Sequence, residues 1–114
     1  MSKVHDLKCW PESFNAIRSG RKRFEVRVDD GRDYGVGDIL RLREWDPDTA
    51  AYTGRMLAAE VTYLMRSAPH QPVALPAGVV VMSLMCRGDR LTGVGPDASS
   101  LAYLASVREE LTGG

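Results

Sequence analysis

Three stretches of the chain alternate apolar and polar residues with a period of two, and this pattern constrains the fold more than any other feature. The stretches cover residues 23–28, 39–45 and 57–65. Successive side chains of a strand point to opposite faces, so such alternation is typical of strands with one buried face. The apolar faces consist of Phe24, Val26 and Val28, of Leu40 and Leu42, and of Leu57, Ala59, Val61, Tyr63 and Met65. We expect these three strands to share one core.

Two further strands and two helices complete the predicted secondary structure. Residues 4–10 form a short extended run, after which Pro11 suits the first position of a helix that Gly20 ends. Residues 79–85 are apolar at nearly every position, which predicts a strand covered on both faces. Residues 97–111 carry an apolar stripe at helical spacing. The predicted class is α+β and mostly β: a five- to six-stranded barrel with a short helix after the first strand and an extra C-terminal helix.

The length of 114 residues fits a single domain. We expect residues 1–87 to form the barrel, and residues 88–114 to supply a glycine-rich connection and a helix that packs on the same domain. The longest apolar stretch, residues 78–86, is far shorter than the ~20 residues of a membrane-spanning helix. Two cysteines and two histidines form neither a disulfide framework nor a spaced zinc motif. The expectation is a cytoplasmic domain with no metal, no cofactor and no membrane contact, as a monomer or weak homodimer.

The net charge of zero conceals an uneven distribution along the chain. Residues 1–28 hold seven basic and three acidic residues, a net charge of +4, and the remainder carries −4. A concentrated basic patch can attract a phosphate backbone even when the whole protein is neutral. An ordinary solvated helix end and loop would give the same pattern, so charge alone leaves both readings open.

Several sequence motifs occur along the chain in an unusual combination. They are His5-x-Leu7-Lys8-x-Trp10-Pro11-x-x-Phe14, Ile17-x-x-Gly20-x-Lys22-x-Phe24-Glu25-x-Arg27, Val36-Gly37-Asp38-x-Leu40, Tyr52-Thr53-Gly54-Arg55 and Val80-Val81-Met82-Ser83. This series resembles the ASCH domains of the PUA-like superfamily and is most similar to a short bacterial and phage subgroup of uncharacterised function. The similarity covers roughly residues 4 to 86.

The resemblance implies a small β-barrel whose cleft is lined by Lys22, Glu25 and Arg27. It also implies binding of RNA or of a nucleotide-like ligand, because ASCH domains are thought to bind such molecules. A few bacterial members of the family resemble small hydrolases instead. The amidohydrolase members have a threonine nucleophile where this chain has Glu25, so their activity does not carry over. An extra Gly31 in the loop of residues 29–33 is a second departure from the pattern.

Six residues are candidates for the site: Lys8, Trp10, Lys22, Glu25, Arg27 and Glu44. Glu25 and Arg27 are two apart on a strand and therefore share a face. Arg27 offers a planar fork to a phosphate or a base edge, and Glu25 can accept a hydrogen bond from a base amino group or orient Lys22. A wet-surface ion pair is the plain structural alternative for these two residues.

The other candidates are weighed in the same way. Lys8 beside Trp10 suits stacking on a base, whereas a tryptophan before a helix-starting proline can also be a core plug. Glu44 points inward and needs a cationic partner, which Lys8, Lys22 or Arg27 could supply.

Three functions follow, in order of preference. The first is recognition of RNA, a nucleotide or a modified base in the cleft. The second is a small hydrolase acting on RNA or a modified nucleoside, in which Lys22 and a carboxylate, Glu25 or Glu44, form the catalytic acid/base pair. The third is a protein-interaction module of phage or mobile-element origin that contacts its partner through the C-terminal helix.

Overall fold

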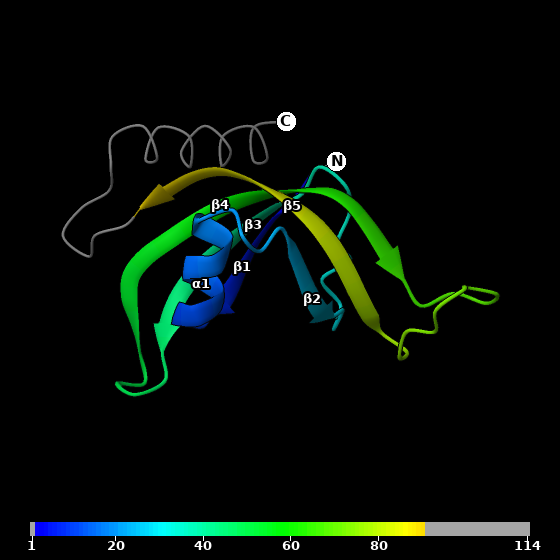
Figure 1. The fold of residues 1–114 in the computed structure, drawn as a ribbon, viewed down its shortest axis with the longest axis horizontal. Helices are drawn as coiled ribbons and strands as arrows, with labels where there is room; N and C mark the ends of the chain where they lie inside the picture. Colours follow the sequence, from blue (N-terminus) through cyan, green and yellow to red (C-terminus); the bar gives the residue numbers. More distant parts are fainter. Residues whose placement is uncertain (1, 91–114) are drawn as a thin grey trace.

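A computed structural model describes residues 2–90 of the chain (Figure 1). The single helix of this part, α1, follows the first strand. In chain order the elements are β1 (Val4–Cys9), α1 (Pro11–Arg18), β2 (Phe24–Val28), β3 (Ile39–Asp46), β4 (Ala51–Arg66) and β5 (Val79–Arg90). The predicted strands and the early helix are therefore all present.

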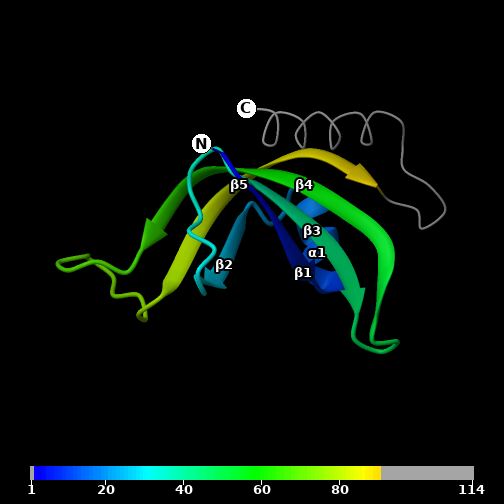
Figure 2. The same ribbon diagram turned by 180° about the vertical axis from the view of Figure 1, so that it is seen from behind.

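The five strands form one sheet in the order β1-β3-β4-β5-β2. β1 runs parallel to β3, and the other neighbouring strands are antiparallel. The long strands β4 and β5 bend strongly, so that the sheet curls into an arch (Figures 1 and 2). The prediction of a mostly-β α+β fold is confirmed, but the sheet forms a half-barrel. Its two edge strands, β1 and β2, face each other across a gap that we call the seam.

Irregular pairing between β4 and β5 accompanies the bend of β4. The register shifts between Ala58 and Ala59, and again between Val61 and Tyr63, where Thr62 is the extra residue of a β-bulge. A bulge reverses the faces of the residues after it, so Val61 is buried while Tyr63 is 69% exposed. The prediction that Tyr63 and Met65 belong to the core is therefore wrong.

Helix α1 lies inside the arch and closes the core from its concave side (Figure 1). Pro11 occupies its first turn, and Gly20 with φ of 80° follows its end, as predicted. Burial of Phe14 and of Ile17 contributes roughly 1.5–3 kcal/mol for each side chain. The core that these two residues cover comprises Leu7, Cys9, Tyr34, Leu40, Leu42, Leu57, Ala59, Val61, Val80, Met82 and Leu84.

Strand β2 has the opposite orientation to the predicted one. Phe24 and Val26 are each 49% exposed, whereas Glu25 is only 5% exposed. Glu25 pairs with Met82 of β5, which is fully buried. Because paired residues of antiparallel strands share a face, this register turns Glu25 inward and the apolar residues of β2 outward. The apolar face of β2 was thus assigned to the wrong side of the sheet.

Strand β5 also differs from its prediction. Val80 and Met82 are buried on the concave side, but Met85 on the other side is 48% exposed, so the strand is not covered on both faces. β5 continues to Arg90, whereas the sequence suggested a glycine-rich connection from residue 88. The helix predicted for residues 97–111 lies outside the described residues.

Candidate functional site

A pocket of about 390 Å³ opens at the seam, where the end of β1 and the first turn of α1 face β2. Its position follows from the half-barrel, because an unpaired seam leaves a gap that a closed sheet would fill. The pocket is lined by Lys8, Cys9, Trp10, Ser13, Glu25, Val26 and Arg27. Four of the six predicted site residues, Lys8, Trp10, Glu25 and Arg27, therefore line one cavity, which we call the seam pocket.

Glu25 is the buried charge of the seam pocket, and two cations neutralise it. Its Oε1 lies 3.7 Å from Lys22 Nζ, and its Oε2 lies 3.2 Å from an Arg27 guanidinium nitrogen. A buried carboxylate is costly unless it is paired, so these contacts explain how Glu25 can take an inward position of β2. Lys22, Glu25 and Arg27 thus converge on one side of the barrel.

Arg27 also bridges the two edge strands. Its guanidinium donates a hydrogen bond of 2.7 Å to the carbonyl oxygen of Lys8 on β1. A planar guanidinium held at both the Lys8 carbonyl and Glu25 loses little further freedom when it meets a ligand. Arg27 is therefore a fixed donor at the mouth of the seam pocket.

Two further residues of the seam pocket were not predicted as site residues. Ser13, in the first turn of α1, accepts a hydrogen bond from Lys22 Nζ. It lies nine positions before Lys22 in the sequence, and no local pattern connects the two. Cys9 was predicted as a small buried residue; it is buried, and it also faces the pocket. Burial raises the pKa of the Cys9 thiol, and the nearby Glu25 carboxylate raises it further, so Cys9 is held as a neutral thiol.

The aromatic candidates differ from their predicted arrangement. Trp10 is 57% exposed beside the seam pocket, so it is not a core plug. The ammonium of Lys8 lies 4.1 Å from the ring centroid of Trp45, not over Trp10. The Lys8 side chain is on the outward side of β1, between buried Leu7 and Cys9. At the seam, Lys8 contacts Arg27 through its main-chain carbonyl oxygen.

Glu44 faces inward as predicted but does not join the seam pocket. Its Oε1 accepts a 2.7 Å hydrogen bond from the Thr53 hydroxyl, and its Oε2 lies 3.4 Å from Arg55. The prediction that Lys8, Lys22 or Arg27 is the cationic partner of Glu44 is wrong. Arg55, on the adjacent strand β4, lies beside the Glu44 carboxylate and takes this role. Arg55 also stacks on the Phe14 ring, 4.7 Å away, so this pair helps to hold α1 in place.

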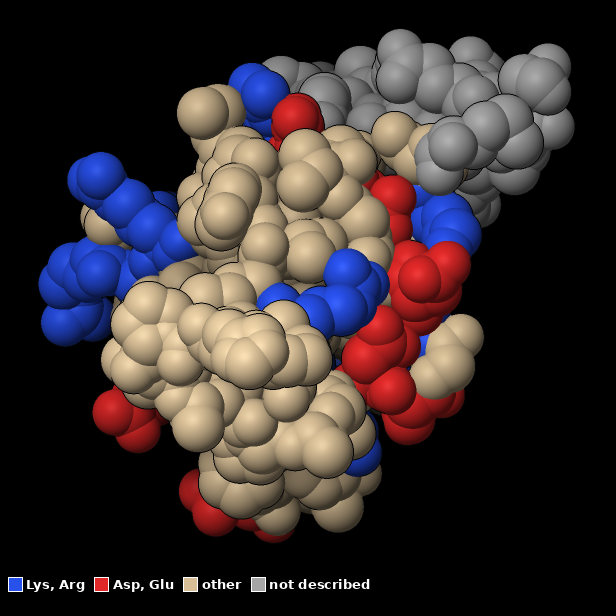
Figure 3. Space-filling model, turned by 90° about the vertical axis from the view of Figure 1, so that its right-hand side faces the viewer, with Lys and Arg blue, Asp and Glu red and all other residues tan. Residues whose placement is uncertain are grey.

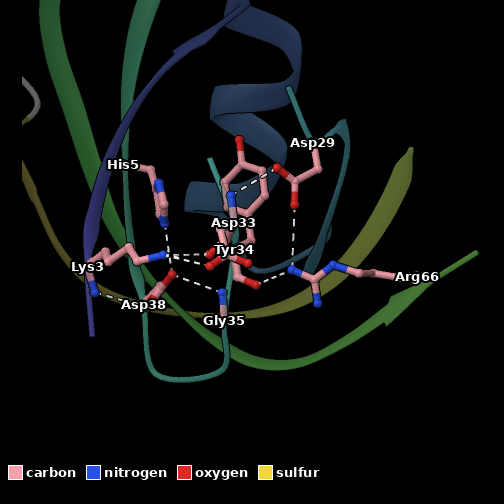
Figure 4. Close-up of polar contacts among 8 residues, drawn as sticks. All are labelled: Lys3, His5, Asp29, Asp33, Tyr34, Gly35, Asp38 and Arg66. Carbon is pink, nitrogen blue, oxygen red and sulfur yellow. Dashed lines mark hydrogen bonds and ion pairs between the residues drawn. The ribbon is translucent and has the colours of Figure 1, made fainter. Parts of the chain in front are cut away.

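A second buried polar cluster lies at another part of the half-barrel (Figure 4). Asp38 accepts hydrogen bonds of 2.9 Å from the main-chain N–H groups of Lys3 and Gly35, and its Oδ2 lies 2.8 Å from His5 Nε2. The His5 ring contacts Tyr34, with ring centroids 4.6 Å apart. Burial raises the pKa of the Tyr34 hydroxyl. We call this group the His5–Asp38 cluster.

A loop packs beside the His5–Asp38 cluster (Figure 4). Arg66 donates a hydrogen bond to the Tyr34 carbonyl oxygen and lies 3.5 Å from the Asp29 carboxylate. Gly31, the extra residue of this loop, has φ of 92°, a conformation that glycine adopts without strain. Its neighbour Arg32 pairs with Asp30 at 3.8 Å and does not line the seam pocket.

Uncharged residues cover most of one face of the molecule. Figure 3 shows this face with a group of basic side chains at its left edge, a group of acidic side chains at its right edge and a basic side chain that reaches toward the acidic group. Residues 67–86 contain no Lys, Arg, Asp or Glu. Within residues 2–90, no three His, Cys, Asp or Glu side chains come together as a metal site, and the helix of this part is too short and too polar to cross a membrane.

The fold is a small half-barrel domain with a charged pocket at its seam, and comparison with known proteins gives its family. Residues 4–84 match the family described as a domain of unknown function (DUF3850), so the chain belongs to that family. A protein of Escherichia phage P2, described as an uncharacterized 12.9 kDa protein in the GpA 3' region, is 39% identical over 62 residues. The match covers 54% of each protein, so the chain spans about half the length of this relative. A short phage and bacterial group of uncharacterised proteins, which the motifs predicted, fits both matches.

Proposed function

We propose that this protein binds RNA or a nucleotide, including a modified base, in the seam pocket. The observation that carries the proposal is the buried Glu25 carboxylate, held between Lys22 and Arg27 at the wall of an open cavity of about 390 Å³. Pockets for small molecules and cofactors typically start at about 300 Å³, so one nucleoside is a suitable occupant. Similarity of the motifs to ASCH domains supports the same function, and we propose a PUA-like fold and a cytoplasmic location with it.

Three side chains of the seam pocket have chemistry that suits a nucleotide. Arg27 can donate two parallel hydrogen bonds to a phosphate or a base edge, and Glu25 can accept one from an exocyclic amino group. The exposed Trp10 indole offers a stacking surface, and stacking of a base on an aromatic side chain contributes about 1–3 kcal/mol. Both ends of a nucleotide would thus be met by groups of matching chemistry.

A hydrolase is a second candidate because of one contact, the hydrogen bond from Lys22 to the Ser13 hydroxyl. Hydroxyl groups held by a lysine can act as nucleophiles, and Lys22 with Glu25 could move the proton. Both cations, however, already pair with Glu25. Binding without turnover is therefore preferred. The third candidate is partner recruitment through the helix predicted for residues 97–111, which lie outside the described residues; that function would survive loss of Lys22.

The test combines ligand discovery with a binding assay. Mass spectrometry of the purified native protein would show which nucleotides it retains, and calorimetry would then give their affinity. Neutralising about two to four phosphates should weaken binding visibly between low and physiological salt. Chromatography of the ligand after incubation separates binding from turnover. Absence of any RNA or nucleotide binding at low salt would reject the proposal.

A further inference from the structure

A second pocket of about 330 Å³ lies on the other side of the connection between α1 and β2. Its floor is apolar, since Ile17 and Leu84 are buried, and Met85 at its edge is 48% exposed. The pocket is lined by Ile17, Gly20, Lys22, Arg23, Leu84, Met85 and Cys86. We call it the Met85 pocket.

Lys22 lies between the two pockets. It lines the Met85 pocket, and its ammonium contacts Ser13 and Glu25, which both line the seam pocket. An ammonium group has three N–H donors, and Ser13 and Glu25 take at most two of them. Lys22 can therefore meet an anion that lies between the two cavities.

Arg23 adds a fixed cation to the Met85 pocket. Its Nε donates a 2.9 Å hydrogen bond to the Gly20 carbonyl oxygen, so the exposed side chain is held along its own turn. Gly20 can make this turn because its φ of 80° suits glycine. A guanidinium held in this way presents its flat face and its remaining N–H groups to a ligand.

We infer that the two pockets are consecutive base sites for a single-stranded nucleic acid. One base lies in the seam pocket, the next lies in the Met85 pocket, and the phosphate that joins them meets Lys22. Arg23 holds the second base over the apolar floor of Ile17 and Leu84, because arginine planes pack well on aromatic rings. This inference rests on the proposed function and specifies its ligand: an oligonucleotide with at least two bases should bind more tightly than a mononucleotide.

The experiment compares three adenine probes by calorimetry on the full chain: AMP, ADP and the dinucleotide pApA. ADP adds a phosphate to AMP without a second base, so the gain from ADP to pApA isolates the second base site. We expect pApA to bind about tenfold more tightly than ADP, in line with one additional stacked base. The deoxyribose forms of AMP and pApA form a parallel arm that shows whether RNA or DNA is preferred.

Two variants and two matched controls locate the second site. Arg23→Ala and Arg23→Lys should each reduce the ratio of pApA to ADP affinity by about fivefold or more, because lysine keeps the charge but lacks the planar face. Arg21→Ala and Arg21→Lys make the same changes at an exposed residue of the same turn that lines neither pocket, so the ratio should stay unchanged in both.

The outcomes separate the inference from the proposed function. If pApA and ADP bind equally well, the inference is overturned and nucleotide binding in the seam pocket stands. A ratio that falls equally in the control variants also overturns the inference, because a general surface effect would then explain the gain. If none of the probes binds, the proposed function and the inference both fail.

Discussion

Two of the buried carboxylates of the half-barrel have different kinds of partner: Glu25 in the seam pocket and Asp38 in the His5–Asp38 cluster. Their exposures are 5% and 2%. Asp38 is held by two main-chain N–H groups and one histidine nitrogen, and it joins the chain start to the loop before β3. Glu25 contacts two cationic side chains, Lys22 and Arg27, and borders a cavity.

This difference in partners distinguishes a carboxylate that only holds the fold together from one that a ligand can reach. Main-chain donors cannot leave Asp38 unless the fold opens, so its hydrogen bonds belong to stability. Lys22 and Arg27, by contrast, contact Glu25 through their side chains, and a ligand can meet these groups without any change in the sheet. Burial alone does not separate the two cases, whereas partner type and access to a cavity do.

The largest expected effect is on stability and comes from the closed cluster. Asp38→Ala removes the acceptor of the part-buried Lys3 and Gly35 N–H groups and the partner of the buried His5 ring, so it should reduce the free energy of unfolding by about 3–5 kcal/mol. Urea denaturation measures this loss. Asp6→Ala breaks an exposed ion pair with Arg41 and serves as the control, with a loss under about 1 kcal/mol. Equal losses in the two variants would contradict the structural role of Asp38.

The second expected effect is on binding and comes from the open seam. Lys22→Ala and Arg27→Ala should each weaken nucleotide binding by about 1–3 kcal/mol, as loss of a charge-assisted contact does. Calorimetry with the nucleotide retained by the native protein measures the change. Arg41→Ala is the matched control, because Arg41 pairs with Asp6 away from the pocket. If Arg27→Ala bound as tightly as the native protein, the seam pocket would not be the binding site.

The third, smaller effect is on base preference and comes from Glu25 itself. Glu25→Gln keeps the shape and removes the charge, so we expect a change in base preference of about 1 kcal/mol with little change in phosphate affinity. Affinities for AMP, CMP and UMP, measured in both proteins, give the preference. A uniform change for all three would assign Glu25 to positioning of Lys22 and Arg27. Loss of turnover with retained binding would instead identify the site as catalytic.

Local patterns predicted much of the fold and the centre of the site. Alternation located the strands, and Pro11 with Gly20 located α1, because each signal depends on a few neighbouring residues. The convergence of Glu25 and Arg27 was also predictable, since residues two apart on a strand share a face.

The errors arose where distant pairing decides the outcome. Alternation cannot say which face is buried, so the orientation of β2 depended on its register with Met82 of β5. The bulge at Thr62 turned the Tyr63 side chain to the opposite face of the sheet, and no glycine or proline in the sequence indicates this bulge. The partner of Glu44 lies eleven residues away, in Arg55 on the adjacent strand, and Ser13 reaches Lys22 only once α1 docks under the arch.

The smallest expected effect concerns the loop beside the closed cluster. The Asp33 main-chain N–H donates a 2.9 Å hydrogen bond to the Asp29 carboxylate, and this bond, with help from Arg66, holds the pKa of Asp29 below its ordinary value. A carboxyl with a depressed folded-state pKa stabilises the fold above its unfolded pKa, and the contribution is lost as the pH falls through the folded value.

Asp29 should therefore contribute stability above about pH 4 and lose it in more acidic solution, with a size under about 1 kcal/mol because the pair with Arg66 is partly exposed. Asn at this position can still accept the Asp33 hydrogen bond but carries no charge. Urea denaturation of the native protein and of Asp29→Asn, between pH 2.5 and 6, should give curves that differ above pH 4 and converge below it. Curves that coincide over the whole range would assign the stabilisation to the hydrogen bond alone, and the loop would then contribute nothing that depends on pH.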